Sequence, residues 1–139
     1  MNINKNYVNK LVSEIETGIK EVLELSRKPF DEFSIAEKYA IRYCLIVIAE
    51  VLTALAIHIA RRGFGVEPET PIHALRILRD RNLLTSDECE ELEKLVRLRN
   101  LLVHRYWTVD DRKIYEAIKS DFSALVSFVE KVKKVFGYG

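Results

Sequence analysis

The feature that most constrains this chain is one long apolar segment, Tyr43–Ala60, with a single carboxylate, Glu50, near its middle. The segment is long enough to cross a bilayer as a helix. A carboxylate at mid-membrane depth, however, costs about 2.5–3.5 kcal/mol on insertion scales. No second apolar span follows, and the rest of the sequence is amphipathic. We therefore interpret the segment as a bundle helix that is covered on almost every side, with no membrane partner.

Length and charge narrow the class of protein further. The chain has 139 residues, and its 22 Lys and Arg nearly balance 21 Asp and Glu, for a net charge of +1. Residues 1–139 are therefore predicted to form a single domain. The balance excludes a strongly basic protein that holds nucleic acid through bulk charge, so any RNA contact must come from a local patch. Only five Gly and three Pro disfavour a loop-rich or all-β fold.

The cysteines and the first residues bear on the compartment. Cys44 and Cys89 are isolated, without a C-x-x-C pair, and both lie in segments whose apolar residues follow helical periodicity. We expect reduced, buried thiols in a cytosolic protein. The first residues contain no apolar signal core, which also favours a cytoplasmic location.

Helical periodicity and capping signals divide the chain into five helices, four long and one short. The predicted fold is therefore an all-α up-and-down bundle with short loops. The expected helices run from about 4 to 27, from 31 or 34 to 62, and from Pro71 to about 81 behind a Thr70 cap. The fourth opens at a capping box, Thr85–Glu88, and the last at a second box, Thr108–Asp111.

The apolar second helix also bears on assembly. A helix that is apolar almost all round needs cover on every side, and three neighbours in a small bundle cannot easily supply it. We therefore expect a homodimer with this helix near the seam.

The fourth helix carries the segment with the most chemistry, Leu98–Trp107. On a helical wheel Arg99 falls inside the apolar stripe, where a guanidinium is costly unless it is paired or functional. Tyr106 would lie within about 20° of Arg99 if the helix continued, whereas His104 would point about 140° away. Either the helix loosens after Val103, or the site is completed across a dimer axis.

Arg99, His104 and Tyr106 form the pattern Arg-x4-His-x-Tyr, within the run RNLLVHRYW. This pattern resembles the signature of the HepT branch of the HEPN superfamily, and helix order and length match over nearly the whole chain. The resemblance implies a HEPN-type homodimer with the motifs facing one cleft. It also implies a toxin ribonuclease with an MntA-type nucleotidyltransferase antitoxin, which attaches AMP to the position of Tyr106.

The residue types suit metal-independent RNA cleavage, without a cofactor, by attack of the 2′-OH on its own phosphate. His104 can accept or donate a proton near neutrality. Arg99 can stabilise the phosphate oxygens in the transition state. Asn100 is a candidate to support Arg99 or hold a phosphate. The histidines lack partners at ligand spacing, so we expect no metal site.

Each of these residues also has a purely structural interpretation. Arg99 could be an ion-pair partner of Glu50, and Glu50 could bridge to Arg99 or Arg97 rather than serve as an acid. His104 could cap the helix C-terminus, and Trp107 is expected in the core. Four further arginines either line an RNA track or belong to a solvated surface: Arg76, Arg79, Arg97 and Arg105.

The alternative function is a non-catalytic HEPN subunit, or a nucleotide-binding accessory, of a nucleotidyltransferase partner. A purely structural helical dimer is the third possibility. The chain has no nucleotidyltransferase signature of its own, so that activity would come from another polypeptide.

Overall fold

A computed structural model describes residues 2–137, apart from the side chains of 119–121. Within them there are five α-helices and no strand, which confirms the all-α prediction of four long helices and one short helix. The helices are α1 (Lys5–Leu25), α2 (Ile35–His58), α3 (Pro71–Asp80), α4 (Ser86–His104) and α5 (Asp111–Phe136). A π-helical turn, Ile59–Gly63, extends α2, and 3-10 turns occupy Phe30–Glu32 and Tyr106–Thr108.

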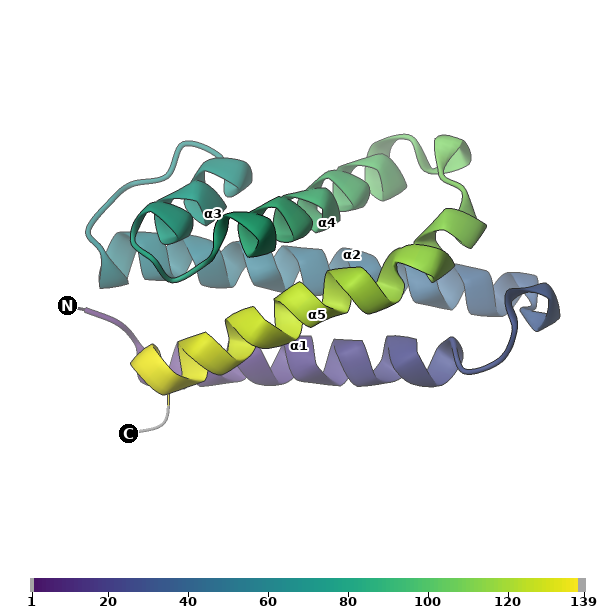
Figure 1. The fold of residues 1–139 in the computed structure, drawn as a ribbon, viewed down its shortest axis with the longest axis horizontal. Helices are drawn as coiled ribbons and strands as arrows, with labels where there is room; N and C mark the ends of the chain where they lie inside the picture. The colour runs from purple at the N-terminus through teal and green to yellow at the C-terminus, as the bar shows by residue number, and fades with distance from the viewer. Residues whose placement is uncertain (1, 138–139) are drawn as a thin grey trace.

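The four long helices run along the long axis of the molecule, and α3 lies beside α4 against one end of α2 (Figure 1). The start of α1 and the end of α5 lie at the same end of the bundle (Figure 1). Helix α2 packs against α1, α3 and α4, which makes it the central element.

Side-chain caps place the helix starts close to where the sequence predicted them. Asn4 and Thr70 each accept a hydrogen bond from a backbone N–H of the first turn of α1 and α3. Complete capping boxes open α2, with Ser34, and α4, with Thr85. These caps satisfy backbone donors that a helix start otherwise leaves unpaired.

The prediction that a second capping box at Thr108 opens the last helix is wrong. Asp110 caps α5 by accepting from the Arg112 N–H at 2.9 Å. The Thr108 hydroxyl instead donates to the Arg105 carbonyl at 2.8 Å, which closes the 3-10 turn after α4. Because Asp caps a helix at least as well as Thr, α5 starts after Asp110 and leaves Thr108 to the turn.

Helix α2 supplies much of the core but is not fully covered. Ile35–Gly63 is long and apolar enough to cross a membrane, and half of its most apolar window is buried in the bundle, as for a core helix. Its N-terminal half nevertheless exposes Ile35, Tyr39 and Tyr43, each about two-thirds accessible. The apolar cover that the sequence required is therefore incomplete within one chain.

The two thiols differ in burial, so the expectation that both are buried is wrong for Cys44, which is only partly buried. Cys89 is buried. Burial, together with the neighbouring Glu93 carboxylate, raises the pKa of the Cys89 thiol to about 11. Cys89 therefore stays protonated and unreactive at neutral pH.

Glu88 joins the start of α4 to α5. Besides completing the Thr85 box, its carboxylate accepts from the Ser127 hydroxyl and the Lys131 ammonium. Burial by itself raises the pKa of Glu88, but Lys131, Ser127 and the Thr85 N–H outweigh burial and lower it to about 2. The ionised carboxylate is thus the form that the fold stabilises.

Stability is expected to respond to acid through this carboxylate. A depressed pKa means that the stabilisation is present above the ordinary value of 4.5 and is lost as the pH falls towards 2. Glu88→Gln can still accept the hydrogen bond of the capping box, but it loses the negative charge beside Lys131. The variant should therefore lose about 1–2 kcal/mol of unfolding free energy at pH 7. Urea unfolding at pH 7 and at pH 2.5 measures this difference, which should shrink at the lower pH. The exposed Glu90→Gln is the control, and equal effects of the two variants would contradict the assignment.

Candidate active site

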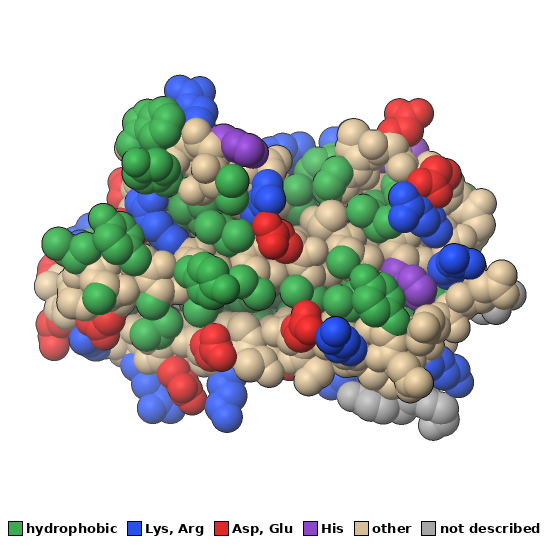
Figure 2. Space-filling view, turned by 180° about the vertical axis from the view of Figure 1, so that it is seen from behind, with side chains coloured by type: hydrophobic (Ala, Val, Ile, Leu, Met, Phe, Trp, Pro, Cys, Tyr) green, Lys and Arg blue, Asp and Glu red, His purple; other side chains and the backbone are tan. Residues whose placement is uncertain are grey.

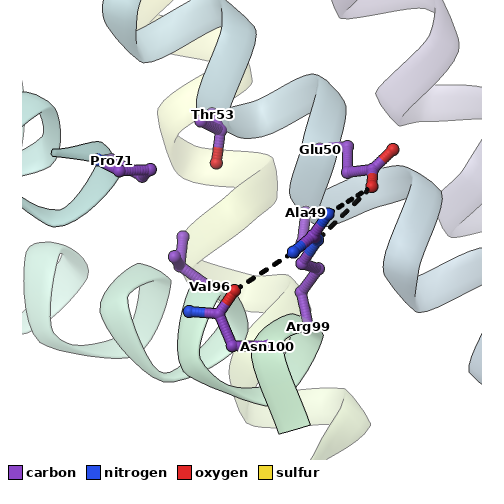
Figure 3. Close-up of a pocket in the computed structure, with 7 residues that line it drawn as sticks. All are labelled: Ala49, Glu50, Thr53, Pro71, Val96, Arg99 and Asn100. Carbon is purple, nitrogen blue, oxygen red and sulfur yellow. Dashed lines mark hydrogen bonds and ion pairs between the residues drawn. The ribbon is translucent and has the colours of Figure 1, made fainter. Parts of the chain in front are cut away.

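Arg99 reaches from α4 across to α2 and pairs with Glu50. Its Nη2 lies 2.9 Å and its Nε 3.3 Å from Glu50 Oε1, while Nη1 donates to Asn100 Oδ1 at 3.3 Å. Figure 3 shows the guanidinium held between these two side chains. Of the interpretations left open by the sequence, the Glu50–Arg99 pair is the one the structure contains. The pair orients Arg99 while leaving 29% of its side chain accessible.

A cavity of about 250 Å³ adjoins this pair between α2, α3 and α4. It brings together three of the predicted site residues, Glu50, Arg99 and Asn100. The remaining lining residues are Ala49, Thr53, Pro71 and Val96. Arg99 therefore faces an open space rather than packed side chains.

His104 is the last residue of α4, and its side chain is exposed. The helix breaks only at Arg105, whose φ of −143° and ψ of 43° are not helical. Of the two alternatives, loosening of the helix directly after Val103 does not occur, because the helix persists through His104. Five residues of intact helix turn His104 about 140° from Arg99. A single chain thus presents the two side chains on different faces of α4.

Tyr106 and Trp107 lie in the 3-10 turn that follows α4. Their side chains are 61% and 68% exposed, and their rings meet edge to face with centroids 5.3 Å apart. The prediction of Trp107 as a core residue is wrong. Because α4 ends at His104, neither side chain continues the buried stripe of that helix, and the expected alignment of Tyr106 with Arg99 is lost as well.

Arg42 on α2 holds this turn in place, and the sequence analysis did not single it out. Its guanidinium donates to the carbonyls of Tyr106 and Val109, each at 2.9 Å, and to Asp111 Oδ1 at 2.7 Å. Its side chain is only 14% exposed. One signal was available, because Arg42 is a lone cation at the edge of the apolar helix. Its backbone partners, however, could not be read from side-chain patterns.

The predicted arginine track is partly neutralised. Arg76 and Arg97 both donate to Glu93 Oε1 at 3.0 Å, and Glu93 is only 6% exposed. Burial raises the pKa of this carboxyl, but its bonds to Arg76, Cys89 and Arg97 outweigh burial and lower the pKa. Arg79 pairs with Asp80. Arg105, exposed beside His104, is the member of the set nearest to the motif.

Potential metal ligands do not cluster in the described part of the chain. No group of three or more His, Cys, Asp or Glu side chains there could hold a metal ion. The residues gathered at the cavity are an arginine, a carboxylate and an amide, which are suited to orienting an anion.

Removing the Arg42 clamp should loosen the turn that carries Tyr106. Arg42→Met keeps the aliphatic length but deletes three hydrogen bonds, so we expect a loss of about 2–3 kcal/mol of unfolding free energy. Amide hydrogen exchange over 105–110 should become at least tenfold faster. Arg62→Met, at an exposed position, is the control. Unchanged exchange in this segment would show that Arg42 does not hold it.

Comparison with known proteins shows that other chains share this fold. In the solved complex of a tri-AMPylated Shewanella oneidensis HEPN toxin with its MNT antitoxin, the matching chain superposes with a TM-score of 0.85 at 20% identity, covering 94% of this chain and 99% of that one. A toxin–antitoxin crystal structure with AMP-PNP gives 0.84 at 19% identity, covering 93% and 98%.

YutE, a cytosolic protein of Bacillus subtilis, is similar in structure and in sequence. Its structure gives a TM-score of 0.82 at 21% identity, over 96% of this chain and 90% of that one. The curated YutE of strain 168 is 35% identical over 57 residues, a match that spans 41% of this chain and only 40% of YutE. The family described as HepT-like ribonucleases matches residues 14–132. The chain therefore belongs to the HepT-like ribonuclease family.

Proposed function

We propose that this protein is a homodimeric, metal-independent RNA endonuclease of the cytoplasm and the toxin of a toxin–antitoxin pair. The observation that carries the proposal is Arg99, oriented by Glu50 and Asn100 beside an open cavity and five residues before an exposed His104. That arrangement occurs in a chain of a ribonuclease family.

The chemistry needs only these side chains and the RNA. His104 takes the proton of a 2′-OH, whose oxygen attacks the adjacent phosphorus. The protonated His104 then gives this proton to the 5′-oxygen as the P–O5′ bond breaks, leaving a 2′,3′-cyclic phosphate and a 5′-OH. A guanidinium has five N–H donors, of which Glu50 and Asn100 engage three. The two that remain can stabilise the phosphate oxygens as their charge grows.

The exposed apolar surface supports a dimer. Ile35, Tyr39 and Tyr43 of α2 are each about two-thirds exposed, and their spacing of four residues places them on one face of the helix. Figure 2 shows hydrophobic side chains spread across the face opposite α5. Large apolar side chains exposed on one helix face are a feature of interaction surfaces. A second copy here would cover α2 and place two motifs together, which the different directions of Arg99 and His104 require.

Regulation by a nucleotidyltransferase is the third part of the proposal. Structurally similar toxins occur in complexes with MNT-type antitoxins, one of them AMPylated. Tyr106 is 61% exposed at the end of the motif, so its hydroxyl is open to a modifying enzyme. A bound AMP would add bulk and negative charge beside the site and repel phosphate.

Cleavage of RNA tests the catalytic assignment directly. The purified wild-type protein, incubated with total RNA in EDTA, should produce fragments ending in 2′,3′-cyclic phosphate. His104→Ala and Arg99→Ala should each lower the rate about 100-fold or more, because one removes the acid–base group and the other the charge stabilisation. Arg62→Ala, at an exposed arginine outside the proposed RNA track, is the matched control. Equal inertness of wild type and variants would reject the nuclease.

Mixed dimers test whether the site is shared between subunits. We expect a heterodimer of Arg99→Ala with His104→Ala, purified through two different tags, to recover about half of the wild-type rate. One of its two composite sites then keeps both intact side chains, provided that each site combines the two subunits. Recovery below a few per cent would mean that each site is built within one chain.

Modification of Tyr106 has a simple readout. Co-expression with a nucleotidyltransferase of the MNT type should add the mass of AMP to the peptide containing Tyr106, and RNA cleavage should fall. Tyr106→Phe should stay unmodified and keep its nuclease rate, because a modification site need not take part in catalysis. Absence of the adduct from the wild-type protein would refute this regulation.

A non-catalytic accessory subunit is the second candidate. The observation that favours it is that Arg99 is already paired with a carboxylate, as a structural arginine would be. The RNA assay above distinguishes the two, since an accessory subunit would leave RNA intact whether or not His104 is present.

A further inference from the structure

We propose that the cavity beside Arg99 is a nucleobase subsite. It would hold the base of a nucleotide next to the phosphate that Arg99 binds, so this inference rests on the proposed function. The first support is that the cavity adjoins the proposed phosphate site. Arg99 and Asn100 belong to that site and also line the cavity. In a nucleotide held there by its phosphate, the ribose links the base to that phosphate, so the base lies close enough to enter the cavity.

The walls of the cavity suit a flat ring. Ala49 and Val96, 1% and 5% exposed, give it an apolar floor. The Pro71 ring at the start of α3 and the Arg99 guanidinium stand on opposite sides of the space (Figure 3). Bases stack favourably on guanidinium planes and on apolar side chains.

Polar groups at the edge suit the mixed donors and acceptors of a base. Thr53 of α2 turns its hydroxyl towards the space, and the Asn100 amide nitrogen points to it from α4 (Figure 3). Asn100 Oδ1 is engaged by Arg99, so the amide nitrogen remains to donate. Among the described residues Thr53 has no side-chain hydrogen bond, and a hydroxyl can both donate and accept.

Charge and size argue against other occupants. Among the described residues that line the cavity, Arg99 is the cation and is already paired, so a second phosphate would face the Glu50 carboxylate. The volume of about 250 Å³ exceeds the need of a single water, about 30 Å³. A neutral ring with polar edges fits both conditions. RNA would then be cleaved with a preference for the base at one position beside the scissile bond.

Cleavage of defined RNA oligonucleotides tests this subsite. Wild type should prefer one base at a fixed position, and an abasic ribose there should slow cleavage at least tenfold. Thr53→Leu, which fills the cavity, should slow cleavage of the normal oligonucleotide and abolish its advantage over the abasic one. Thr53→Val removes the hydroxyl with little change in shape and should weaken the base preference. Thr17→Leu, an exposed substitution on α1, is the control.

The outcomes separate the two proposals. Cleavage by wild type without base preference, or with unchanged preference in folded Thr53→Leu, overturns the subsite and leaves the nuclease standing. No cleavage of any RNA overturns the nuclease, and binding then decides the subsite. In that case 3′-nucleoside monophosphates should shift the NMR signal of the Thr53 methyl more than ribose 5-phosphate does. Equal shifts by the two ligands would overturn the subsite as well.

Discussion

The need to cover one almost wholly apolar helix organises this molecule. Helix α2 packs against α1, α3 and α4 and buries aliphatic side chains in the shared core. Beyond Lys38 it carries two charged side chains, Arg42 and Glu50, and each binds a segment of the motif. Arg42 holds the turn with Tyr106, and Glu50 holds Arg99. The core helix is thus also the support of the candidate site.

This arrangement explains why the bundle can keep a carboxylate, Glu50, on its apolar central helix. A charge at the edge of an apolar surface is tolerated when a partner and residual solvent compensate for lost hydration. Glu50 and Arg99 meet that condition, because both are partly exposed and mutually bonded. The same partial exposure leaves Arg99 accessible to an anionic ligand, so the structural pair and the proposed catalytic role do not exclude each other.

Local sequence signals predicted the elements well where the physics is local. The predicted Thr85 box and Thr70 cap depend on residues three positions apart, and the structure contains both. The failure at Thr108 shows the limit. Two capping residues, Thr108 and Asp110, stood close together, and the turn after α4 decided between them by using the Thr108 hydroxyl. Trp107 failed for a related reason, since its exposure follows from where α4 ends.

The sequence by itself determined the all-α class, the order of the helices and the motif that marks the family, because periodicity, caps and the Arg-x4-His-x-Tyr spacing are properties of neighbouring residues. The sequence named Glu50 as a possible partner of Arg99, but only the tertiary structure decided that this pair forms and that Arg42 clamps the turn. Glu50 lies 49 positions from Arg99, and Arg42 binds main-chain carbonyls 64 and 67 positions away. Contacts of that range depend on how the helices pack, and backbone acceptors look the same at every residue.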